Sequence, residues 1–324
     1  MLKHGKAERE GVEVSIVAPF FNEEENVDSF FARLLPVLER LGMTYEIVCV
    51  NDGSNDGTLA KLLERRRSHP HTKIINFSRN FGKEMALTAG LRYASGRGVI
   101  PIDADLQDPP ELIETFITEW RKGFDVVYAV RTERHGEPFL KKCTALLFYK
   151  LINFFSDTPI PKNTGDFRLL DRRVVEVLNH IPERTRFMKG LFAWVGFKQV
   201  GVPFERQNRR EGKTSWNYWK LWNFALDAIT LFSSSALKLW SYAGLIISLL
   251  AFFYGIVLIS YTLVFGKDVP GYASIMVVIL FLGGIQLISL GIIGEYLSRV
   301  YVEVQRRPPY IISETYGFDK KEAT

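Results

Sequence analysis

Two long runs without a charged residue limit what this 324-residue chain can fold into. The first extends from Leu239 to Gly266 and the second from Val269 to Gly294. Each exceeds the roughly 20 apolar residues with which a helix spans a bilayer. Buried core helices are the alternative interpretation, but such helices are usually shorter and rarely occur as an adjacent pair. We therefore predict two transmembrane helices, at residues 238–266 and 273–298.

The charges that flank these runs predict an orientation. Lys238 precedes the first run, and Arg299, Arg306 and Arg307 follow the second, whereas one lysine and one aspartate cancel in the connector. Basic residues concentrate on the cytoplasmic side of membrane proteins. The polar start of the chain lacks the apolar segment of a signal peptide. We therefore expect residues 1–205 and both termini in the cytoplasm, at the inner (plasma) membrane.

The segments that flank the predicted helices have their own composition. Between residues 206 and 226, lysines and arginines alternate with tryptophan, tyrosine and phenylalanine, which suits helices that lie in the lipid headgroup region. We expect amphipathic juxtamembrane helices at residues 206–237, with a soluble surface helix as the alternative. Residues 299–324 are expected to form a cytoplasmic tail.

Composition excludes several other classes of protein. The net charge of +5 comes without a basic stripe or a recognition motif, so we expect no nucleic-acid partner. Two cysteines, Cys49 and Cys143, provide neither a disulfide framework nor a metal cluster, and we expect both to be buried and unreactive. The sequence does not determine the oligomeric state, and a homo-oligomer is one possibility.

The part of the chain before Lys238 alternates short β-branched runs with helical patterns. Such alternation is typical of βαβ units and predicts an α/β fold with a mostly parallel sheet. The predicted strands are Val14–Pro19, Tyr45–Val50, Lys73–Phe77, Gly98–Ile102, Asp125–Val130 and Phe167–Leu170. One predicted helix, Asn22–Leu41, has apolar residues at helical spacing, namely Val27, Phe30, Phe31, Leu34, Leu35 and Leu38.

Two carboxylates, Asp103 and Asp105, follow directly on an apolar strand. Residues i and i+2 project to one side, and open α/β sheets bind ligands at the carboxyl ends of their strands. The two like charges repel unless a cation lies between them. Mg²⁺ and Mn²⁺ prefer carboxylate oxygens and substrate phosphates. A solvated acidic loop is the alternative, but the strand and the following Pro109-Pro110 favour a metal site.

A second acidic segment, Asn51–Thr58, also follows a strand. It resembles a calcium-binding loop in its alternate oxygen-bearing residues, but Leu63 occupies the twelfth position, which requires glutamate, and a strand replaces the preceding helix. We therefore interpret it as a strand–turn–helix loop. Asp52 is expected at the sheet edge, and Asp56 or Thr58 at the start of the next helix.

Common nucleotide-binding loops are absent from the sequence. No G-x-G-x-x-G follows the first strand, and neither Gly82-Lys83 nor Gly212-Lys213 has the upstream glycine of a P-loop. These absences argue against dehydrogenases and P-loop ATPases.

Four segments carry a family resemblance: Val14–Glu24, Val50–Thr58, Arg79–Leu87 and Asp103–Glu111. In this order they resemble family 2 glycosyltransferases of the GT-A fold. More narrowly, they are similar to polyisoprenyl-phosphate glycosyltransferases, which include dolichol-phosphate mannose synthase and bacterial undecaprenyl-phosphate glucosyl- and aminoarabinosyltransferases. The likeness covers residues 14–221, and the two predicted transmembrane helices match the bacterial members.

The resemblance implies roles for residues at the strand ends. It implies that Pro19, Glu23 and Asp52 contact the nucleoside and that Asp103 lies near the ribose and diphosphate. It also implies that Asp105, with Gln107, holds Mg²⁺ or Mn²⁺. Asp166, in the segment Asn163–Arg168, would be the aspartate closest to the reacting centre, so Asp166 and Asp105 are the catalytic candidates. A loop carboxylate that caps the next turn is the alternative for Asp166.

Basic residues near the predicted sheet edge and membrane are candidates for binding an acceptor phosphate. They are Arg131, Arg134, Arg209, Arg210 and Lys213. The planar guanidinium of arginine suits phosphate because it donates two parallel charge-assisted hydrogen bonds. Each of these residues alone is more often a surface residue.

The resemblance therefore implies an inverting, metal-dependent hexosyltransferase that transfers a sugar from a nucleotide diphosphate sugar to a polyisoprenyl phosphate in a lipid bilayer. UDP-glucose is the first expectation for the donor and GDP-mannose the second. A phosphate monoester with a second pKa of about 6 is largely ionised at neutral pH, so the nucleophile requires no strong base. A processive polysaccharide synthase would carry a Q-x-x-R-W element, which this chain lacks. A non-catalytic scaffold that senses nucleotide sugars is a further alternative.

Overall fold

The computed structural model describes residues 11–132, 164–184, 186–204, 235–266 and 271–318. The chain divides into two compact units. The first comprises residues 1–149, 159–216 and 308–324, and the second comprises residues 150–158 and 217–307.

The first unit is built on a sheet with helices along both faces. Its strands are β1 (Val14–Phe20), β2 (Tyr45–Asn51), β3 (Thr72–Phe77), β4 (Gly98–Pro101), β5 (Val126–Arg131), β6 (Thr164–Asp171), β7 (Gln199–Phe204) and β8 (Ile312–Tyr316). Its described helices are α1 (Glu24–Leu41), α2 (Thr58–Ser68), α3 (Lys83–Tyr93), α4 (Leu112–Arg121), α6 (Arg172–His180) and α7 (Met188–Trp194). The predicted α/β fold is confirmed, with β7 and β8 as strands that sequence analysis did not predict.

The sheet has the strand order β7-β5-β6-β4-β1-β2-β3-β8. Its centre is parallel, because β1 pairs with β2 and β4, and β2 with β3. The strand β6 runs antiparallel between β4 and β5. The amino end of β6 therefore lies at the same edge of the sheet as the carboxyl ends of β1, β2 and β4.

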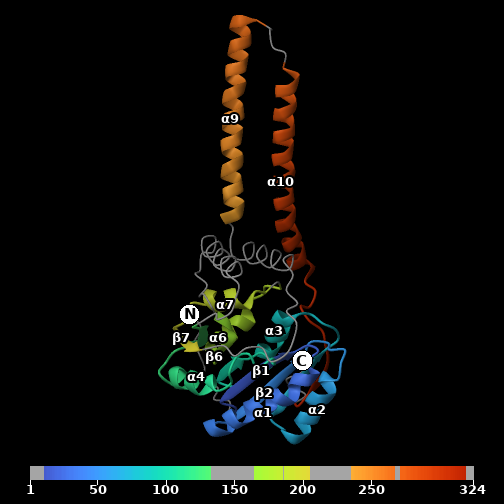
Figure 1. The fold of residues 1–324 in the computed structure, drawn as a ribbon, viewed down its shortest axis with the longest axis vertical. Helices are drawn as coiled ribbons and strands as arrows, with labels where there is room; N and C mark the ends of the chain where they lie inside the picture. The colour runs from blue at the N-terminus through green and yellow to red at the C-terminus, as the bar shows by residue number, and fades with distance from the viewer. Residues whose placement is uncertain (1–10, 133–163, 185, 205–234, 267–270, 319–324) are drawn as a thin grey trace. The chain divides into compact units, whose positions relative to one another are not determined.

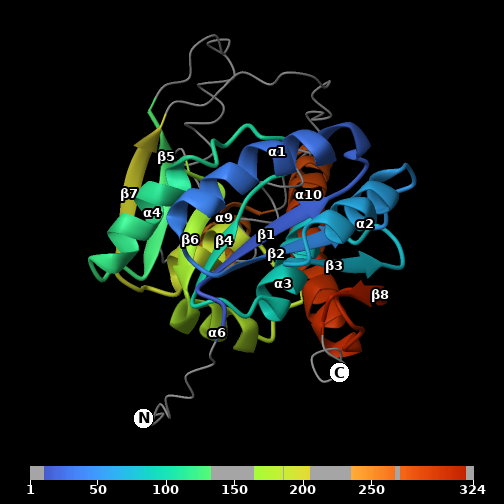
Figure 2. The ribbon, with the colours of Figure 1, turned by 90° about the horizontal axis from the view of Figure 1, so that it is seen from below.

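Helices cover both faces of the sheet, which explains why its central strands are continuous apolar runs. Figure 2 shows α1, α2 and α4 on one face and α3 and α6 on the other, and α1 contacts α2 while α3 contacts α6. The apolar positions predicted for α1 are all buried. At its start, the ring of Phe30 meets those of Phe20 and Phe31 edge to face, at 5.4 and 5.6 Å between ring centroids. This packing holds the end of β1 against α1.

The C-terminal segment differs from the expected tail. Residues Ile312–Tyr316 form β8 antiparallel to β3, and the ring of Tyr310 stacks on Phe77 with 5.0 Å between centroids. The Ser78 amide donates to the Ile311 carbonyl at 3.0 Å. A five-residue edge strand has too short an alternation to be distinguished from a polar tail in the sequence, and its pairing depends on β3, more than two hundred residues earlier in the chain.

The second unit contains the long helices α9 (Ser235–Phe265) and α10 (Tyr272–Gln305), labelled in Figure 1. Many of their large apolar side chains are exposed, such as Leu263 at 82% and Leu287 at 72%. Among the described residues, Val277–Gln305 is the one stretch long and apolar enough to cross a membrane, and a second apolar stretch, Phe252–Phe265, is shorter. The second transmembrane helix therefore stays a prediction.

Candidate functional site

Three predicted site residues meet at one edge of the sheet, where β4 ends and β6 begins. Asp103 and Asp105 follow β4, and Asp166 is the third residue of β6. The side chain of Lys83, the first residue of α3, lies between two of them. Its Nζ is 2.7 Å from Asp103 Oδ1, 2.8 Å from Asp103 Oδ2 and 2.7 Å from Asp166 Oδ2. One ammonium thus bridges two carboxylates that come from different strands.

The charges in this cluster keep Asp166 ionised. Burial alone would raise the pKa of the Asp166 carboxyl, but the positive charge of Lys83 and the hydrogen bond from it outweigh burial, aided by Lys189 and Arg168. The pKa of Asp166 is lowered to about 2. Partial burial of the ammonium would lower the pKa of Lys83, but the two carboxylates raise it above its ordinary value. Both groups are therefore charged at neutral pH.

Asp52 holds the loop that brings Lys83 to this position. The Asp52 side chain is buried, with the residue 2% exposed. Its Oδ1 accepts from the amide of Phe81 at 2.7 Å and its Oδ2 from that of Gly82 at 2.9 Å. Burial raises the pKa of Asp52, and these two hydrogen bonds oppose that rise. The structure thus gives Asp52 a role in building the start of α3, and its contact with a nucleoside stays a prediction.

Gly53 allows this close contact between loops. Its φ is 63°, and an added Cβ would lie 2.2 Å from the backbone carbon of Arg79 and 2.5 Å from the amide nitrogen of Asn80. No side chain fits there, so only glycine lets the loop after β2 pack directly on the loop after β3.

The turn after β4 is strained where the sequence predicts the metal. Leu106 has a φ of 54°, a left-handed conformation that costs about 1–3 kcal/mol for a residue other than glycine. The amide of Gln107 donates to Asp105 Oδ1 at 3.2 Å, which closes the turn. This hydrogen bond joins the Gln107 backbone to the Asp105 side chain, and the shared metal site of these two residues stays a prediction.

The side chains at this edge of the sheet fit a divalent cation that is bound partly by the protein and partly by its substrate. Carboxylate oxygens are the donors that Mg²⁺ and Mn²⁺ prefer. The buried Oδ1 of Asp166 accepts no hydrogen bond from the described residues. Within these same residues, no group of three or more acidic, histidine or cysteine side chains could by itself hold a metal. The buried Oδ1 of Asp166 and the carboxylate of Asp105 are donors that suit such a cation when substrate phosphate and water supply its other ligands.

The loop after β1 is joined to the loop after β2. Pro19 is half-buried and lies opposite Val50 in the sheet. The amide of Glu23 donates to Thr58 Oγ1 at 3.0 Å, and Asp56 Oδ1 accepts from the Thr58 amide at 3.0 Å. Asp56 therefore bonds the first amide of α2, as one of the two predicted alternatives, but the N-cap residue itself is Gly57 and Thr58 is the first residue of the helix. Both Pro19 and Glu23 lie at the same edge of the sheet as Asp103.

Of the predicted acceptor-binding residues, Arg131 lies within the described part of the chain. It ends β5, and its Nη2 is 3.6 Å from the position that a Cβ on Gly165 would occupy. Arg131 therefore reaches the backbone next to Asp166. The predictions for Arg134, Arg209 and Lys213, together with Arg210 and Cys143, lie outside the described residues. Cys49 is buried, as predicted.

Sequence analysis missed Lys83 and the adjacent Glu84. Glu84 Oε2 accepts from the amide of Met188 at 3.0 Å and so joins α3 to α7. Burial, together with the charge of Asp166, raises the pKa of Glu84 to about 7. The available signal was a Gly-Lys-Glu sequence in the segment after a strand, just before a helical pattern, but nothing in the sequence shows which carboxylates the lysine reaches.

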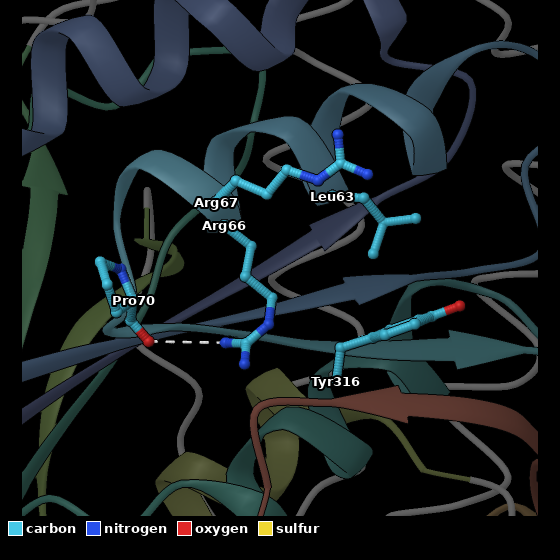
Figure 3. A pocket seen from close by; sticks show the side chains of 5 residues that line it. All are labelled: Leu63, Arg66, Arg67, Pro70 and Tyr316. Atoms are coloured by element: carbon cyan, nitrogen blue, oxygen red, sulfur yellow. Dashed lines mark hydrogen bonds between the residues drawn. The ribbon is translucent and has the colours of Figure 1, made fainter.

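A separate cavity of about 450 Å³ lies at the opposite edge of the sheet. Figure 3 shows its lining residues, Leu63, Arg66, Arg67, Pro70 and Tyr316. Arg66 Nη1 donates to the carbonyl of Thr72, the first residue of β3, at 2.5 Å, and approaches that of Pro70 at 3.5 Å. Because the guanidinium bonds backbone carbonyls at the amino end of β3, we interpret it as a structural contact.

Known proteins are similar to this chain over most of its length. An uncharacterized glycosyltransferase from Synechocystis sp. is 59% identical over 308 residues, which cover 95% of this chain and 97% of that protein. The SfII prophage-derived bactoprenol glucosyl transferase from Shigella flexneri is 47% identical over 305 residues, which cover 94% and 99%. The crystal structure of mannosyl-3-phosphoglycerate synthase from Rubrobacter xylanophilus is 22% identical, with a TM-score of 0.46, and covers 67% of this chain and 72% of that one.

Two family profiles match successive parts of the chain. The GtrB C-terminal hairpin profile matches residues 237–300, the region of the two apolar runs. The glycosyl transferase family 2 profile matches residues 15–178, which include β1 to β6 and the Asp103, Asp105 and Asp166 cluster. On this match and on the identity to its relatives, the chain belongs to glycosyl transferase family 2.

Proposed function

We propose that this glycosyltransferase transfers glucose from UDP-glucose to a membrane-embedded polyprenyl phosphate, with inversion at the anomeric carbon. The observation that carries the proposal is the meeting of Asp103, Asp105 and Asp166 at the carboxyl edge of the sheet, in a chain that continues into an exposed apolar helix. The bactoprenol glucosyl transferase relative, similar over nearly its whole length, supports this donor sugar and acceptor class.

The proposed reaction transfers the glucosyl group from one phosphate oxygen to another. A phosphate oxygen of the acceptor attacks the anomeric carbon, a new carbon–oxygen bond forms, and the bond to the nucleoside diphosphate breaks. The diphosphate leaves with the electron pair. The acceptor phosphate, with a second pKa of about 6, is already largely ionised at neutral pH. No proton therefore has to be removed in this step.

The lowered pKa of Asp166 supports such a mechanism. A carboxylate with a pKa of about 2 is a weak base. Asp166 would instead act as a fixed negative charge that orients Lys83 and favours positive charge at the anomeric carbon. Alignment of the two substrates would then contribute most of the rate enhancement.

Asp105, with Gln107, would hold Mg²⁺ or Mn²⁺, which would neutralise charge on the departing diphosphate. Arg131 would hold the acceptor phosphate beside Asp166 together with Arg134, Arg209 and Lys213. Donor contacts would come from Pro19, Glu23, Asp52 and Asp103.

We further propose that α9 and α10 span the inner membrane, with residues 1–205 and both termini in the cytoplasm and juxtamembrane helices at residues 206–237. The exposed apolar side chains of both helices support this, since a water-soluble helix rarely exposes so many of them together. The pairing of β8 with β3 supports the proposal that the C-terminal segment lies on the same side of the membrane as the catalytic unit.

The proposal is tested with the purified full-length chain, undecaprenyl phosphate and radiolabelled UDP-glucose or GDP-mannose, each with and without Mg²⁺ or Mn²⁺. We expect a labelled lipid product from UDP-glucose that requires both the acceptor and a divalent cation. A product from GDP-mannose alone would replace the donor, and a long polymer would indicate a processive synthase. Binding of nucleotide sugar without any transfer would indicate a non-catalytic sensor and refute the proposal.

A further inference from the structure

Lys83 occupies the place between carboxylates where a cation is needed. Its ammonium lies within 2.8 Å of three carboxylate oxygens from Asp103 and Asp166. Asp105, two residues after Asp103, adds a further negative charge to the same turn. Without any ligand, the protein thus supplies a positive charge of its own that contacts two carboxylates of this acidic cluster directly.

The fold of α3 does not depend on this side chain. The start of α3 is held by Asp52 through the amides of Phe81 and Gly82. The Lys83 side chain is 43% exposed, so little apolar packing rests on it. Its contacts are therefore electrostatic, and its removal changes the charge of the cluster more than the shape of the loop.

A divalent cation that binds near Asp105 must therefore enter a cluster already partly neutralised. The carboxylates attract the metal, but the nearby ammonium repels it and engages oxygens that the metal could use. The diphosphate of a donor brings additional negative charges and oxygens. With these present, the site can accommodate the ammonium and the metal together.

We propose that Lys83 is a positioning residue that makes divalent metal binding depend on the nucleoside diphosphate, because it acts as counter-ion to Asp103 and Asp166 while the site is empty. The inference rests on the proposed function, since it takes the donor to be a nucleoside diphosphate sugar. Its consequence is an order of events: the metal binds tightly only with the donor, so the empty enzyme does not retain it.

The test measures binding of Mn²⁺ alone to the full-length protein by electron paramagnetic resonance of free Mn²⁺. Removal of the positive charge beside these carboxylates in Lys83→Met should tighten binding at least about tenfold, because the repulsion between the ammonium and the metal is then lost. Lys83→Arg keeps the charge and should stay within about twofold of the wild type. Addition of UDP should reduce the difference between Lys83→Met and wild type to about threefold or less.

Two controls locate the effect. Lys189 acts on Asp166 by its charge, but less strongly than Lys83 does, so Lys189→Met should tighten Mn²⁺ binding by less than about threefold. In the double variant Lys83→Met with Asp105→Asn, the gained affinity should disappear. Should Lys83→Met fail to fold, as judged by its thermal unfolding, Lys83→Gln takes its place with the same expectation.

Equal or weaker Mn²⁺ binding by the folded Lys83→Met protein would overturn the proposal. An equal gain in Lys189→Met, or a gain that survives Asp105→Asn, would overturn it as well, because the effect would then not belong to this cluster. The measurement uses neither sugar nor acceptor. A wild type that transfers glucose while Lys83→Met leaves Mn²⁺ binding unchanged would therefore sink this inference and leave the proposed function standing.

Discussion

Replacement of Asp52 by asparagine tests how the fold positions the site. The carboxylate accepts two backbone hydrogen bonds, from Phe81 at 2.7 Å and from Gly82 at 2.9 Å, and is almost fully buried. An asparagine oxygen can accept one of these bonds, but its amino group then faces the other N–H. A buried donor left without a partner costs about 1–3 kcal/mol. We expect this loss to fall on the loop that begins α3.

The direct measurement is hydrogen exchange of the peptide that contains Phe81 and Gly82. A local loss of about 2 kcal/mol corresponds to roughly 30-fold faster exchange of these amides in Asp52→Asn, with little change in β1 or β2. Because Lys83 follows this loop, glucose transfer should fall about tenfold or more. Asp56→Asn is the matched control, because Asp56 also accepts from a backbone amide at the start of a helix but lies exposed. It should change exchange only near its own helix.

Exchange of Phe81 and Gly82 at the wild-type rate in Asp52→Asn would refute this account of the loop. Faster amide exchange without any loss of glucose transfer would refute the second step, in which the loop positions Lys83 beside the carboxylates.

Three further predictions concern single residues. Asp105→Asn should abolish sugar transfer and leave the thermal unfolding temperature near that of wild type; normal turnover would remove the metal assignment. Arg131→Ala should weaken the response to polyprenyl phosphate about ten- to a hundredfold and leave donor affinity unchanged, because a charge-assisted hydrogen bond of about 1.5–3 kcal/mol is lost. Arg131→Lys should restore part of the response to the acceptor. A loss confined to donor affinity would assign Arg131 to the nucleotide site. Glu84 has a pKa raised to about 7 by burial and by the charge of Asp166. Its contribution to stability is present below its ordinary pKa of 4.5 and is lost as pH rises through about 7. Wild type treated with a chelator should therefore unfold more readily at pH 8 than at pH 5.5, by about 2 kcal/mol, and Glu84→Gln should remove that difference. An unchanged pH dependence in the variant would contradict the assignment.

A topological prediction follows from the charges beside the apolar helices. Protease added to sealed cells should not cleave the loops that contain Asp52 or Asp166, because the large unit is expected in the cytoplasm. Opened cells provide the control. Cleavage of these loops from outside would reverse the proposed orientation.

The candidate site was predictable from sequence where a residue's place follows from the strand before it. Asp103 and Asp105 follow an apolar strand, and the carboxyl ends of parallel strands meet at one edge. Asp166 came from the family resemblance alone, because β6 is antiparallel and follows a long intervening segment. Its arrival beside Asp103 depends on the pairing of β6 with β4.

The amino-acid sequence by itself determined the α/β alternation, the buried face of α1 and the strand-end carboxylates, because the hydrophobic period and the succession of elements along the chain are local properties. Only the tertiary structure decided that Lys83 bridges Asp103 and Asp166, that Asp52 holds the loop before it, and that β8 completes the sheet beside β3. These contacts join segments far apart in the chain, and their energies depend on burial and on distances of a few ångströms. A sequence records which charges are present, but the folded chain decides which of them meet.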